Sequence, residues 1–204
     1  DPEIFSTQPA EDPYPAHFKV GKRLLACCRH DREKRLDHLI DIFVERLAPN
    51  DPDVTLTLVG DGHDHINLAE RAWLSPYADR IYFPGEVPHA STVDWYAHGD
   101  VFVYTSLSET FGNVINEALW CGMPVVALND KMGVAHQVAD EVNGYLIEPN
   151  RVDTEAEFAA RCADLLDNRS MRRVMGEEAA NLARRNSHPE FVLDRFESLY
   201  ETVR

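Results

Sequence analysis

Two glutamates eight positions apart, Glu109 and Glu117, are the side chains of this sequence whose types and spacing best suit chemistry on a ligand. The segment that carries them begins with an apolar run over residues 100–104, which is typical of a buried strand, and continues into a helix that we expect over residues 112–121. Two carboxylates therefore flank the beginning of one helix, at the end of a strand. In an open parallel sheet, ligands bind outside the carboxyl ends of the strands.

The beginning of this helix favours an anion. Gly112 permits close approach of the backbone, and Asn113 and Val114 contribute first-turn N–H groups, which attract phosphates because they have no acceptor within the helix. Glu117 lies one turn further on, where its carboxylate could accept hydrogen bonds from a pair of hydroxyls. Phosphate and sugar hydroxyls together indicate a sugar nucleotide. Taken without context, Glu109 also fits an acid favoured by the helix dipole, and Glu117 a solvated helix residue.

A longer pattern surrounds the two glutamates. Residues 106–126 follow the string S-x-x-E-T-F-G-x-V-x-x-E-A-x-x-C-G-x-P-V-V, which closely resembles the signature of retaining glycosyltransferases with the GT-B architecture, in the family-four group. The resemblance implies that Glu117 holds the ribose hydroxyls and that Glu109 contacts the transferred sugar on its reacting side. It also implies that the segment from Phe111 to Val114 meets the donor sugar and phosphate, although Phe111 fits a core position equally well.

A second landmark of the same family lies at residues 26–40, A-C-C-R-H-D-R-E-K-R-L-D-H-L-I. We expect a buried strand to end at Cys28, so that Arg29 projects at its carboxyl end and Lys34 enters the following helix. Arg29 offers a planar fork suited to phosphate and Lys34 a mobile point charge, although the same charges also fit a solvated face. The family pattern G-R-x-x-x-E-K-G matches at Arg29, Glu33 and Lys34, and it implies that the arginine and the lysine clamp the donor diphosphate.

The sequence departs from the family pattern in two regions. Cys28 and Arg35 stand where glycine is usual, and Arg35 places a bulky side chain beside the expected phosphate site. Lys131-Met-Gly133-Val-Ala-His136 replaces a usual glycine pair and glutamate, so that a sugar or base contact by this loop is left open.

Three weaker signals complete the candidate site. Gly85-Glu86-Val87-Pro88 resembles the family loop whose main chain lies against the nucleotide base, so that Val87 is a candidate for base contact; an ordinary polar turn fits equally well. Gly60-Asp61-Gly62 is interpreted mainly as a turn that leaves a strand. His63 and His65 lack a third ligand, and we expect them on a solvated loop, with no metal site.

Apolar runs that alternate with helical patterns predict an α/β fold, a doubly wound parallel sheet of the Rossmann-like kind. We expect strands over residues 23–28, 54–59, 80–83, 100–104, 123–128 and 144–147. We expect helices over residues 33–47, 64–75, 90–98, 112–121, 133–139, 154–167, 170–186 and 189–203. The Pro-rich residues 1–20 predict an interdomain linker or edge segment, and residues 21–204 a nucleotide-sugar-binding domain with a C-terminal helix.

Composition restricts the partners. The chain has 204 residues and a formal net charge of −15, which argues against nucleic acid and against contact with an anionic membrane, because both require basic patches. No apolar run approaches the length of about 20 residues that a membrane span needs. Four cysteines without metal spacing favour buried, reduced thiols and a cytoplasmic setting.

These observations predict the C-terminal, donor-binding half of a GT-B glycosyltransferase, with Glu109, Arg29 and Lys34 as the catalytic residues. The implied reaction moves a hexosyl unit from a nucleoside diphosphate sugar to an acceptor hydroxyl with retention of configuration, without a metal or other cofactor. Nothing in residues 1–204 resembles the N-terminal acceptor domain of the family, which we expect as a partner. A non-catalytic nucleotide-sugar-binding module and a sugar-nucleotide epimerase stay open as alternatives, whereas no G-x-G-x-x-G supports a dehydrogenase.

Overall fold

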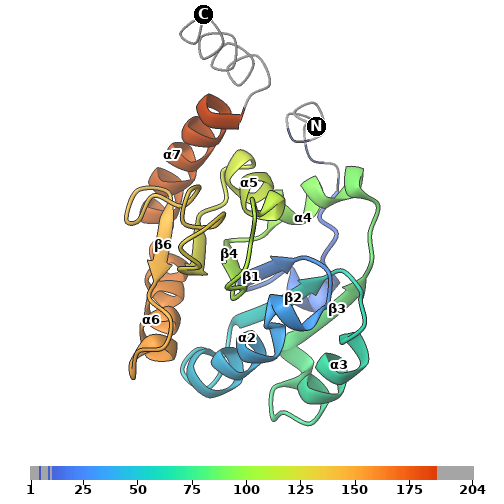
Figure 1. Ribbon diagram of the computed structural model, residues 1–204. Coiled ribbons are helices and arrows are strands. Elements are labelled where there is room, and N and C mark those ends of the chain that lie inside the picture. The colour runs from blue at the N-terminus through green and yellow to red at the C-terminus, as the bar shows by residue number, and fades with distance from the viewer. Residues whose placement is uncertain (1–4, 6–8, 10, 188–204) are drawn as a thin grey trace, which may run out of the picture.

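A parallel sheet forms the centre of the molecule (Figure 1). The computed structural model describes residues 5, 9 and 11–187, and within them six strands pair in parallel in the order β3-β2-β1-β4-β5-β6. The strands are β1 (Lys22–Cys27), β2 (Val54–Val59), β3 (Ile81–Gly85), β4 (Val101–Tyr104), β5 (Val125–Leu128) and β6 (Gly144–Ile147). Each lies within two residues of its expected position, so that the predicted doubly wound α/β fold is confirmed.

The order of the strands reverses beside β1, which pairs with β2 on one side and with β4 on the other. At such a reversal the connections that leave the two neighbouring strands run to opposite faces of the sheet. A crevice therefore opens at the carboxyl ends of the strands, and ligands of doubly wound proteins bind in it. Both family landmarks lie here, since Arg29 follows β1 and Glu109 follows β4.

Helices cover both faces of the sheet. The main helices are α2 (Leu36–Ile42), α3 (His65–Trp73), α4 (Thr92–His98), α5 (Asn113–Trp120), α6 (Thr154–Asp167) and α7 (Arg169–Ser187). Short turns of helix are η1 (Ala16–Phe18), η2 (Arg32–Lys34), the π-helical η3 (Phe43–Leu47), η4 (Ala78–Arg80) and η5 (His89–Ser91). Helices α2, α3 and α6 pack with η3 on one face, and α4 and α5 pack on the other.

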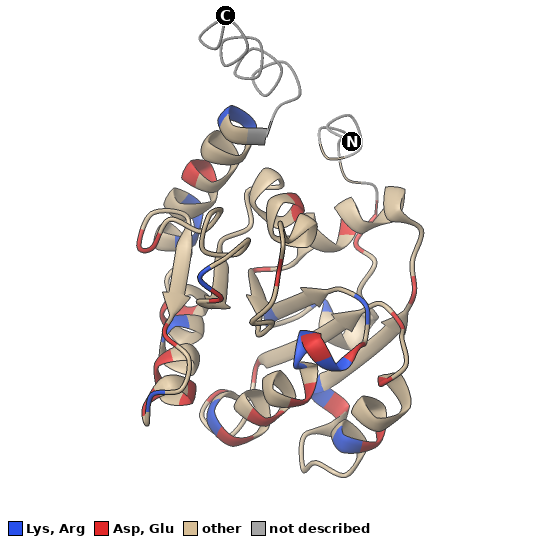
Figure 2. Cartoon of the chain, in the orientation of Figure 1, with Lys and Arg blue, Asp and Glu red and all other residues tan. Residues whose placement is uncertain are grey.

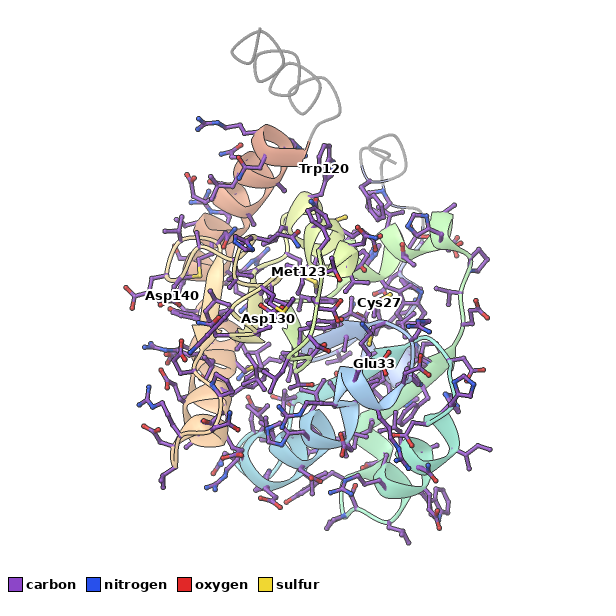
Figure 3. All side chains as sticks on the ribbon, viewed as in Figure 1. Cys27, Glu33, Trp120, Met123, Asp130 and Asp140 are labelled. Carbon is purple, nitrogen blue, oxygen red and sulfur yellow. The ribbon has the colours of Figure 1, made fainter. Side chains whose placement is uncertain are left out.

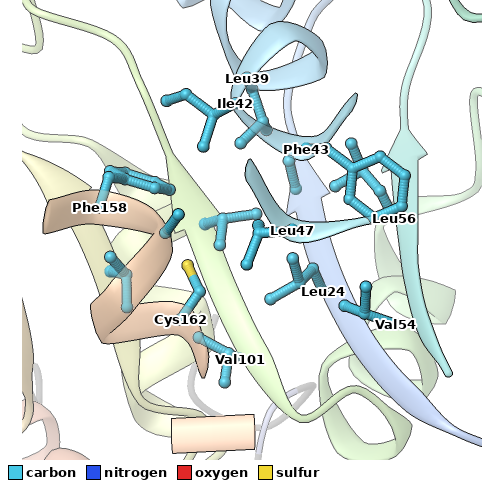
Figure 4. Packing of buried hydrophobic residues seen from close by; sticks show 14 of the residues in the cluster. Leu24, Leu39, Ile42, Phe43, Leu47, Val54, Leu56, Val101, Phe158 and Cys162 are labelled. Atoms are coloured by element: carbon cyan, nitrogen blue, oxygen red, sulfur yellow. The ribbon is translucent and has the colours of Figure 1, made fainter. Parts of the chain in front are cut away.

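The strands alternate between these two cores. Leu24 packs among α2, η3 and α6, whereas its neighbour Leu25 packs among α4 and α5, as the two-residue period of a strand requires. Figure 4 shows the first core, where Phe43 and Leu47 of η3 approach Val54 and Leu56 of β2. Burial on both faces explains why the strands are continuous apolar runs in the sequence.

The helix that we expected over residues 33–47 is divided into η2, α2 and η3. The first division falls at Arg35, which has a φ of 53° in the left-handed region and lies between η2 and α2. The second falls at Phe43, where α2 continues into the π-helical η3. Glycine adopts this region without steric cost, and arginine does so with strain. The position where the resembled family has glycine is therefore one where this chain keeps the same backbone conformation with a larger residue.

The expected helix over residues 133–139 is wrong, because this segment consists of turns. The Asp130 carboxylate accepts hydrogen bonds from three main-chain amides of the loop, those of Met132, Val134 and Ala135 at 2.8, 3.2 and 3.1 Å. Further along, the Ala139 amide donates to the Asn143 side chain at 2.7 Å instead of continuing a helix. Two main-chain bonds of helical spacing persist, from the His136 amide to the Met132 carbonyl and from the Val138 amide to the Val134 carbonyl, but side chains accept the amides on either side of them and no helix forms.

Both ends of the chain were assigned from the sequence. The expected helix over residues 189–203 lies outside the described residues. In the described part of residues 1–20, Tyr14 and Phe18 are buried against the core that contains α4, and the Asp12 carboxylate pairs with Arg23 at 3.1 Å. Among the described helices, none is both long and apolar enough to cross a membrane. Figure 2 shows basic and acidic residues interleaved along α6 and α7 rather than separated by sign.

Candidate functional site: a cleft at the carboxyl ends of the strands

A cavity of about 670 Å³ opens where β1, β2 and β3 end. Its wall is formed by the loop after β1, the glycine turn after β2, the loop after β3 and the first half of α5. The lining residues are Cys27, Cys28, Arg29, Val59, Gly60, Asp61, Gly62, His63, Glu86, Val87, His89, Thr92, Val114 and Glu117. The cavity therefore brings together Arg29, Val87, Val114 and Glu117, which the sequence had assigned to one ligand.

Glu117 is fixed by two partners. Its Oε2 accepts a hydrogen bond from the Tyr96 hydroxyl at 2.9 Å, and its Oε1 lies 3.1 Å from Nε2 of His89. Tyr96 is buried in α4, whereas His89 is more than half exposed in η5. An ionised carboxylate offers about four acceptor positions, so that these two contacts leave acceptor capacity toward the cavity.

Glu109 is the more buried of the two glutamates, with 9% of its surface exposed. Its Oε1 pairs with the Lys34 ammonium at 2.6 Å and accepts a hydrogen bond from the Tyr104 hydroxyl at 2.7 Å. Burial alone would raise the pKa of Glu109, but the hydrogen bonds from Lys34 and Tyr104 outweigh it and hold that pKa below its usual value. Glu109 is therefore an anion at neutral pH.

The two expected phosphate ligands have different surroundings. Lys34 is mostly buried beside Glu109, so that its charge is already paired within the protein. The Arg29 side chain is 72% exposed and contacts Asp31 at 2.8 Å and Glu33 at 3.4 Å. Because the guanidinium itself is mostly in solvent, these pairs contribute little stability, and a phosphate can compete for the arginine.

Helix α5 begins beside Glu109, whose Cβ lies 3.7 Å from the place that a Cβ on Gly112 would take. Gly112 lies before its first residue with a φ of 80°, and no side chain caps the helix there. Of the first-turn amides, that of Ile115 donates to the Gly112 carbonyl at 3.0 Å, whereas those of Asn113 and Val114 precede the first intrahelical acceptor and have no side-chain cap. Asn113 at the beginning of the helix is exposed, whereas Phe111 lines a separate cavity of about 390 Å³ between α5 and α7. Phe111 and Glu117 thus face different spaces.

Asp130 holds the Glu109 loop in place, and sequence reasoning missed it. Besides the three amides of its own loop, its carboxylate accepts the Glu109 amide at 3.3 Å, and its side chain lies toward the middle of the molecule in Figure 3. The neighbouring Gly133 amide donates to the Glu109 carbonyl at 2.8 Å, and a Cβ on Gly133 would lie only 2.6 Å from that oxygen. Its place two residues after β5, at the carboxyl ends of the strands, was the signal that could have identified Asp130.

The departures from the family pattern have defined places. His136, which stands where the family has glutamate, is exposed and lines the cavity between α5 and α7 together with Phe111. Gln137 next to it donates through Nε2 to the Phe111 carbonyl and, at 3.3 Å, to the Gly112 carbonyl. The loop at residues 131–137 therefore supports the beginning of α5 from the side away from the larger cavity.

The histidines near the cavity pair with protein groups. His63 contacts the Asp31 carboxylate at 3.0 Å, and His65 stacks on buried His30 with their Nδ1 atoms 2.9 Å apart. Burial and the neighbouring His65 lower the pKa of His30 to about 4, so that its ring is neutral at pH 7. Within the described residues, no group of three or more His, Cys, Asp or Glu side chains could hold a metal ion.

The fold and the site define a doubly wound α/β domain whose cleft at the carboxyl ends of the strands is lined by Arg29, the first turn of α5 and Glu117. The chain belongs to the family "Glycosyl transferases group 1", whose model matches residues 12–182.

Relatives of known description agree with this assignment. The chain is 26% identical to the gpi3 subunit of the Schizosaccharomyces pombe phosphatidylinositol N-acetylglucosaminyltransferase, over 95% of this chain and 42% of that protein. It is 25% identical to the N-acetyl-alpha-D-glucosaminyl L-malate synthase of Bacillus anthracis, over 89% of this chain and 46% of the synthase. The chain thus spans less than half the length of these curated relatives.

Solved structures share the fold. Anabaena HepE in complex with UDP and glucose superposes with a TM-score of 0.77 at 25% identity, covering all of this chain and 54% of HepE. Staphylococcus aureus TarM in complex with UDP superposes with a TM-score of 0.80 at 23% identity, covering 95% of this chain and 38% of TarM. The second likeness concerns the fold alone.

Proposed function

We propose that this chain is the donor-binding part of a retaining glycosyltransferase that takes a hexosyl unit from a nucleoside diphosphate sugar. The observation that carries the proposal is that Glu117 and Val114 in the first half of α5 line the large cavity, while the Lys34–Glu109 pair lies beside the beginning of the same helix. Each supplies a contact that one part of such a donor requires. HepE, which is similar to this chain, was crystallised with UDP and glucose, and a UDP-sugar is the first donor to test.

In the proposal, three parts of the donor meet different residues. Glu117 would accept hydrogen bonds from the two ribose hydroxyls, and Val87 on the cavity wall would lie against the base. Arg29, Lys34 and the amides that follow Gly112 would bind the diphosphate. Glu109 would accept hydrogen bonds from the transferred sugar, because it is held as an anion beside Lys34.

In the proposed reaction the bond between the anomeric carbon and the phosphate oxygen breaks, and a bond to the acceptor oxygen forms on the same face. The acceptor proton passes to the departing nucleoside diphosphate, so that atoms and charge balance. Negative charge develops on that leaving group, and Arg29, Lys34 and the helix start would stabilise it from fixed positions. These protein cations make a metal unnecessary in the proposal.

Transfer itself would need an acceptor surface, which we assign to a second domain. The relatives are about twice as long as this chain, which covers 42% and 46% of two of them. Positioning both reactants can lower a barrier by roughly 7–11 kcal/mol. Residues 1–204 alone should therefore bind donor but transfer sugar negligibly, and fusion to the other half of such an enzyme should restore transfer.

A thermal scan tests donor binding. At about 100 times its Kd, UDP or GDP should stabilise the folded chain by roughly 2.7 kcal/mol, with EDTA present to remove metals. The matched controls are uridine and guanosine, which lack the diphosphate and should give a smaller rise in Tm. If neither diphosphate raises Tm at millimolar concentration, the proposed function is wrong.

A further inference from the structure

Two buried tyrosines contact the two glutamates, Glu117 in the wall of the cleft and Glu109 beside the beginning of α5. Tyr96 of α4 donates its hydroxyl proton to Glu117 at 2.9 Å, and Tyr104 at the end of β4 donates to Glu109 at 2.7 Å. Each tyrosine is only 1% exposed. The sequence does not distinguish either side chain from an ordinary core residue, yet each hydroxyl donates to one of the two glutamates assigned to the ligand.

Both tyrosines stay protonated, so that each has one proton to donate. Burial is the largest cause that raises the pKa of Tyr96, followed by the neighbouring Cys27 and Glu117. Burial likewise raises the pKa of Tyr104, with Cys28 and Glu109 adding to it. A neutral phenol next to a carboxylate donates its proton to it, since the carboxylate only accepts.

Packing fixes the two rings independently of their hydroxyls. Phe102 lies between them, with its ring centroid 5.8 Å from that of Tyr96 and 6.0 Å from that of Tyr104. All three belong to the core on the α4 and α5 face of the sheet. A tyrosine to phenylalanine change at either position therefore removes one hydroxyl and leaves the ring packing in place.

A glutamate side chain has three rotatable bonds, and a hydrogen bond from a fixed donor restricts it to one arrangement. Tyr96 and Tyr104 each contact one glutamate, so that the two carboxylates are oriented by separate donors. We propose that Tyr96 and Tyr104 are positioning residues, Tyr96 for recognition of the ribose through Glu117 and Tyr104 for recognition of the transferred sugar through Glu109. This inference rests on the proposed function, since it assigns a ligand part to each glutamate.

The experiment compares Tyr96→Phe and Tyr104→Phe, each serving as the matched control of the other. Calorimetry gives Kd values of residues 1–204 for UDP or GDP, whichever stabilises the chain, for its 2′,3′-dideoxy analogue and for the corresponding glucose or N-acetylglucosamine conjugate. Two ratios are compared: dideoxy analogue over parent nucleotide, which reports on the ribose, and nucleotide over sugar nucleotide, which reports on the sugar.

Tyr96→Phe should lower the ribose ratio about 3- to 10-fold, as expected for one hydrogen bond, and leave the sugar ratio unchanged. Tyr104→Phe should lower the sugar ratio by a similar factor and leave the ribose ratio unchanged. A general loss of structure would move both ratios together, or neither, so that the crossed pattern separates positioning from stability.

The outcomes are distinguishable. If the unsubstituted chain binds neither diphosphate, the proposed function fails and this inference fails with it. If the chain binds nucleotide but both variants change both ratios alike, or change neither, the assignment of the tyrosines is overturned while donor binding stands.

A measurement on the unsubstituted protein covers the case in which a variant does not fold. The hydroxyl proton of buried Tyr96, observed by NMR, should shift when UDP or GDP binds and shift less with the dideoxy analogue. An identical shift with both ligands would contradict the role of Tyr96.

Discussion

The side of the sheet where the strands begin, called here its amino edge, and the side where they end, its carboxyl edge, use the same kinds of charged residue in opposite ways. At the amino edge, the Lys22 ammonium at the beginning of β1 contacts the carboxylates of Asp51 and Asp167. Arg172 of α7 pairs with Asp100 at 3.1 Å and donates to the carbonyls of Leu165 and Leu166 at 2.7 and 2.6 Å. These cations have protein partners on several sides.

At the carboxyl edge the charges are less completely satisfied. Arg29 is 72% exposed, and of its two acidic neighbours Glu33 is exposed whereas Asp31 is mostly buried. Lys34 is paired with Glu109, which lies beside the beginning of α5, its Cβ 3.7 Å from the place that a Cβ on Gly112 would take. The beginning of α5 at Gly112 has no side-chain cap. The cations of the amino edge therefore join elements of the fold to one another, whereas the carboxyl edge keeps donors and acceptors available to a ligand.

The largest test of this contrast concerns the diphosphate. Arg29→Ala and Lys34→Ala should each weaken binding of UDP or GDP on the order of 10- to 150-fold, which corresponds to the loss of a charge-assisted hydrogen bond of about 1.5–3 kcal/mol. Binding of the bare nucleoside should barely change. Lys22→Ala at the amino edge is the matched control and should leave both affinities intact. Equal losses for nucleoside and diphosphate would show that Arg29 and Lys34 act on the base or the fold.

The second test removes an amino-edge cation with several partners. Arg172→Ala should lower the free energy of unfolding by about 1–3 kcal/mol. The carbonyls of Leu165 and Leu166 and the Asp100 carboxylate would each lose a largely buried donor. Urea titration measures this, and nucleotide affinity should stay the same. A loss of nucleotide binding by folded Arg172→Ala would break the division between the two edges.

The third test uses pH to examine the Lys34–Glu109 pair. The pKa of folded Glu109 is lowered from its usual 4.5, so that its contribution to stability is present above about pH 4.5 and is lost as pH falls through the lower folded value. Lys34→Met removes the main partner, and the acid loss of stability should then move to higher pH. Lys131→Met, whose exposed side chain lies 3.8 Å from Glu148, is the control and should not shift that profile.

The smallest expected effect is at Lys22. Its side chain is 30% exposed, and exposed ion pairs contribute about 0.2–1 kcal/mol. Lys22→Met should therefore lower the free energy of unfolding by less than about 1 kcal/mol, and the difference should shrink in high salt because salt screens the pairs. A loss that is large and independent of salt would mean that Lys22 has a buried role at this edge.

Elements whose signal is local could be predicted from the sequence. The strands are doubly buried apolar runs, and α5 lies between Gly112 and Gly122, which mark its ends. The helix expected over residues 133–139 is wrong because side chains outside the segment, Asp130 and Asn143, accept amides near both of its ends. Arg35 interrupts the helix expected over residues 33–47 by its left-handed backbone conformation, which the residue type arginine does not predict.

The same distinction holds for the site. Arg29, Lys34, Glu109 and Glu117 carry charges within a family pattern, and the structure brings them to one edge, although their roles stay predictions. Tyr96, Tyr104 and Asp130 were missed because their importance lies in which atom each one contacts across the fold. A tyrosine in an apolar strand is indistinguishable from a core residue until its hydroxyl is seen beside a carboxylate.

The beginning of α5, which lacks a side-chain cap, has a consequence for local opening of its first turn. Amides without a fixed acceptor exchange their protons readily, so that the first turn of α5 should be among the fastest-exchanging parts of the described helices when no ligand is bound. A phosphate bound after Gly112 would supply the missing acceptor and slow that exchange. The bound phosphate would thus complete the hydrogen bonding of the first turn, and its release would return these amides to faster exchange.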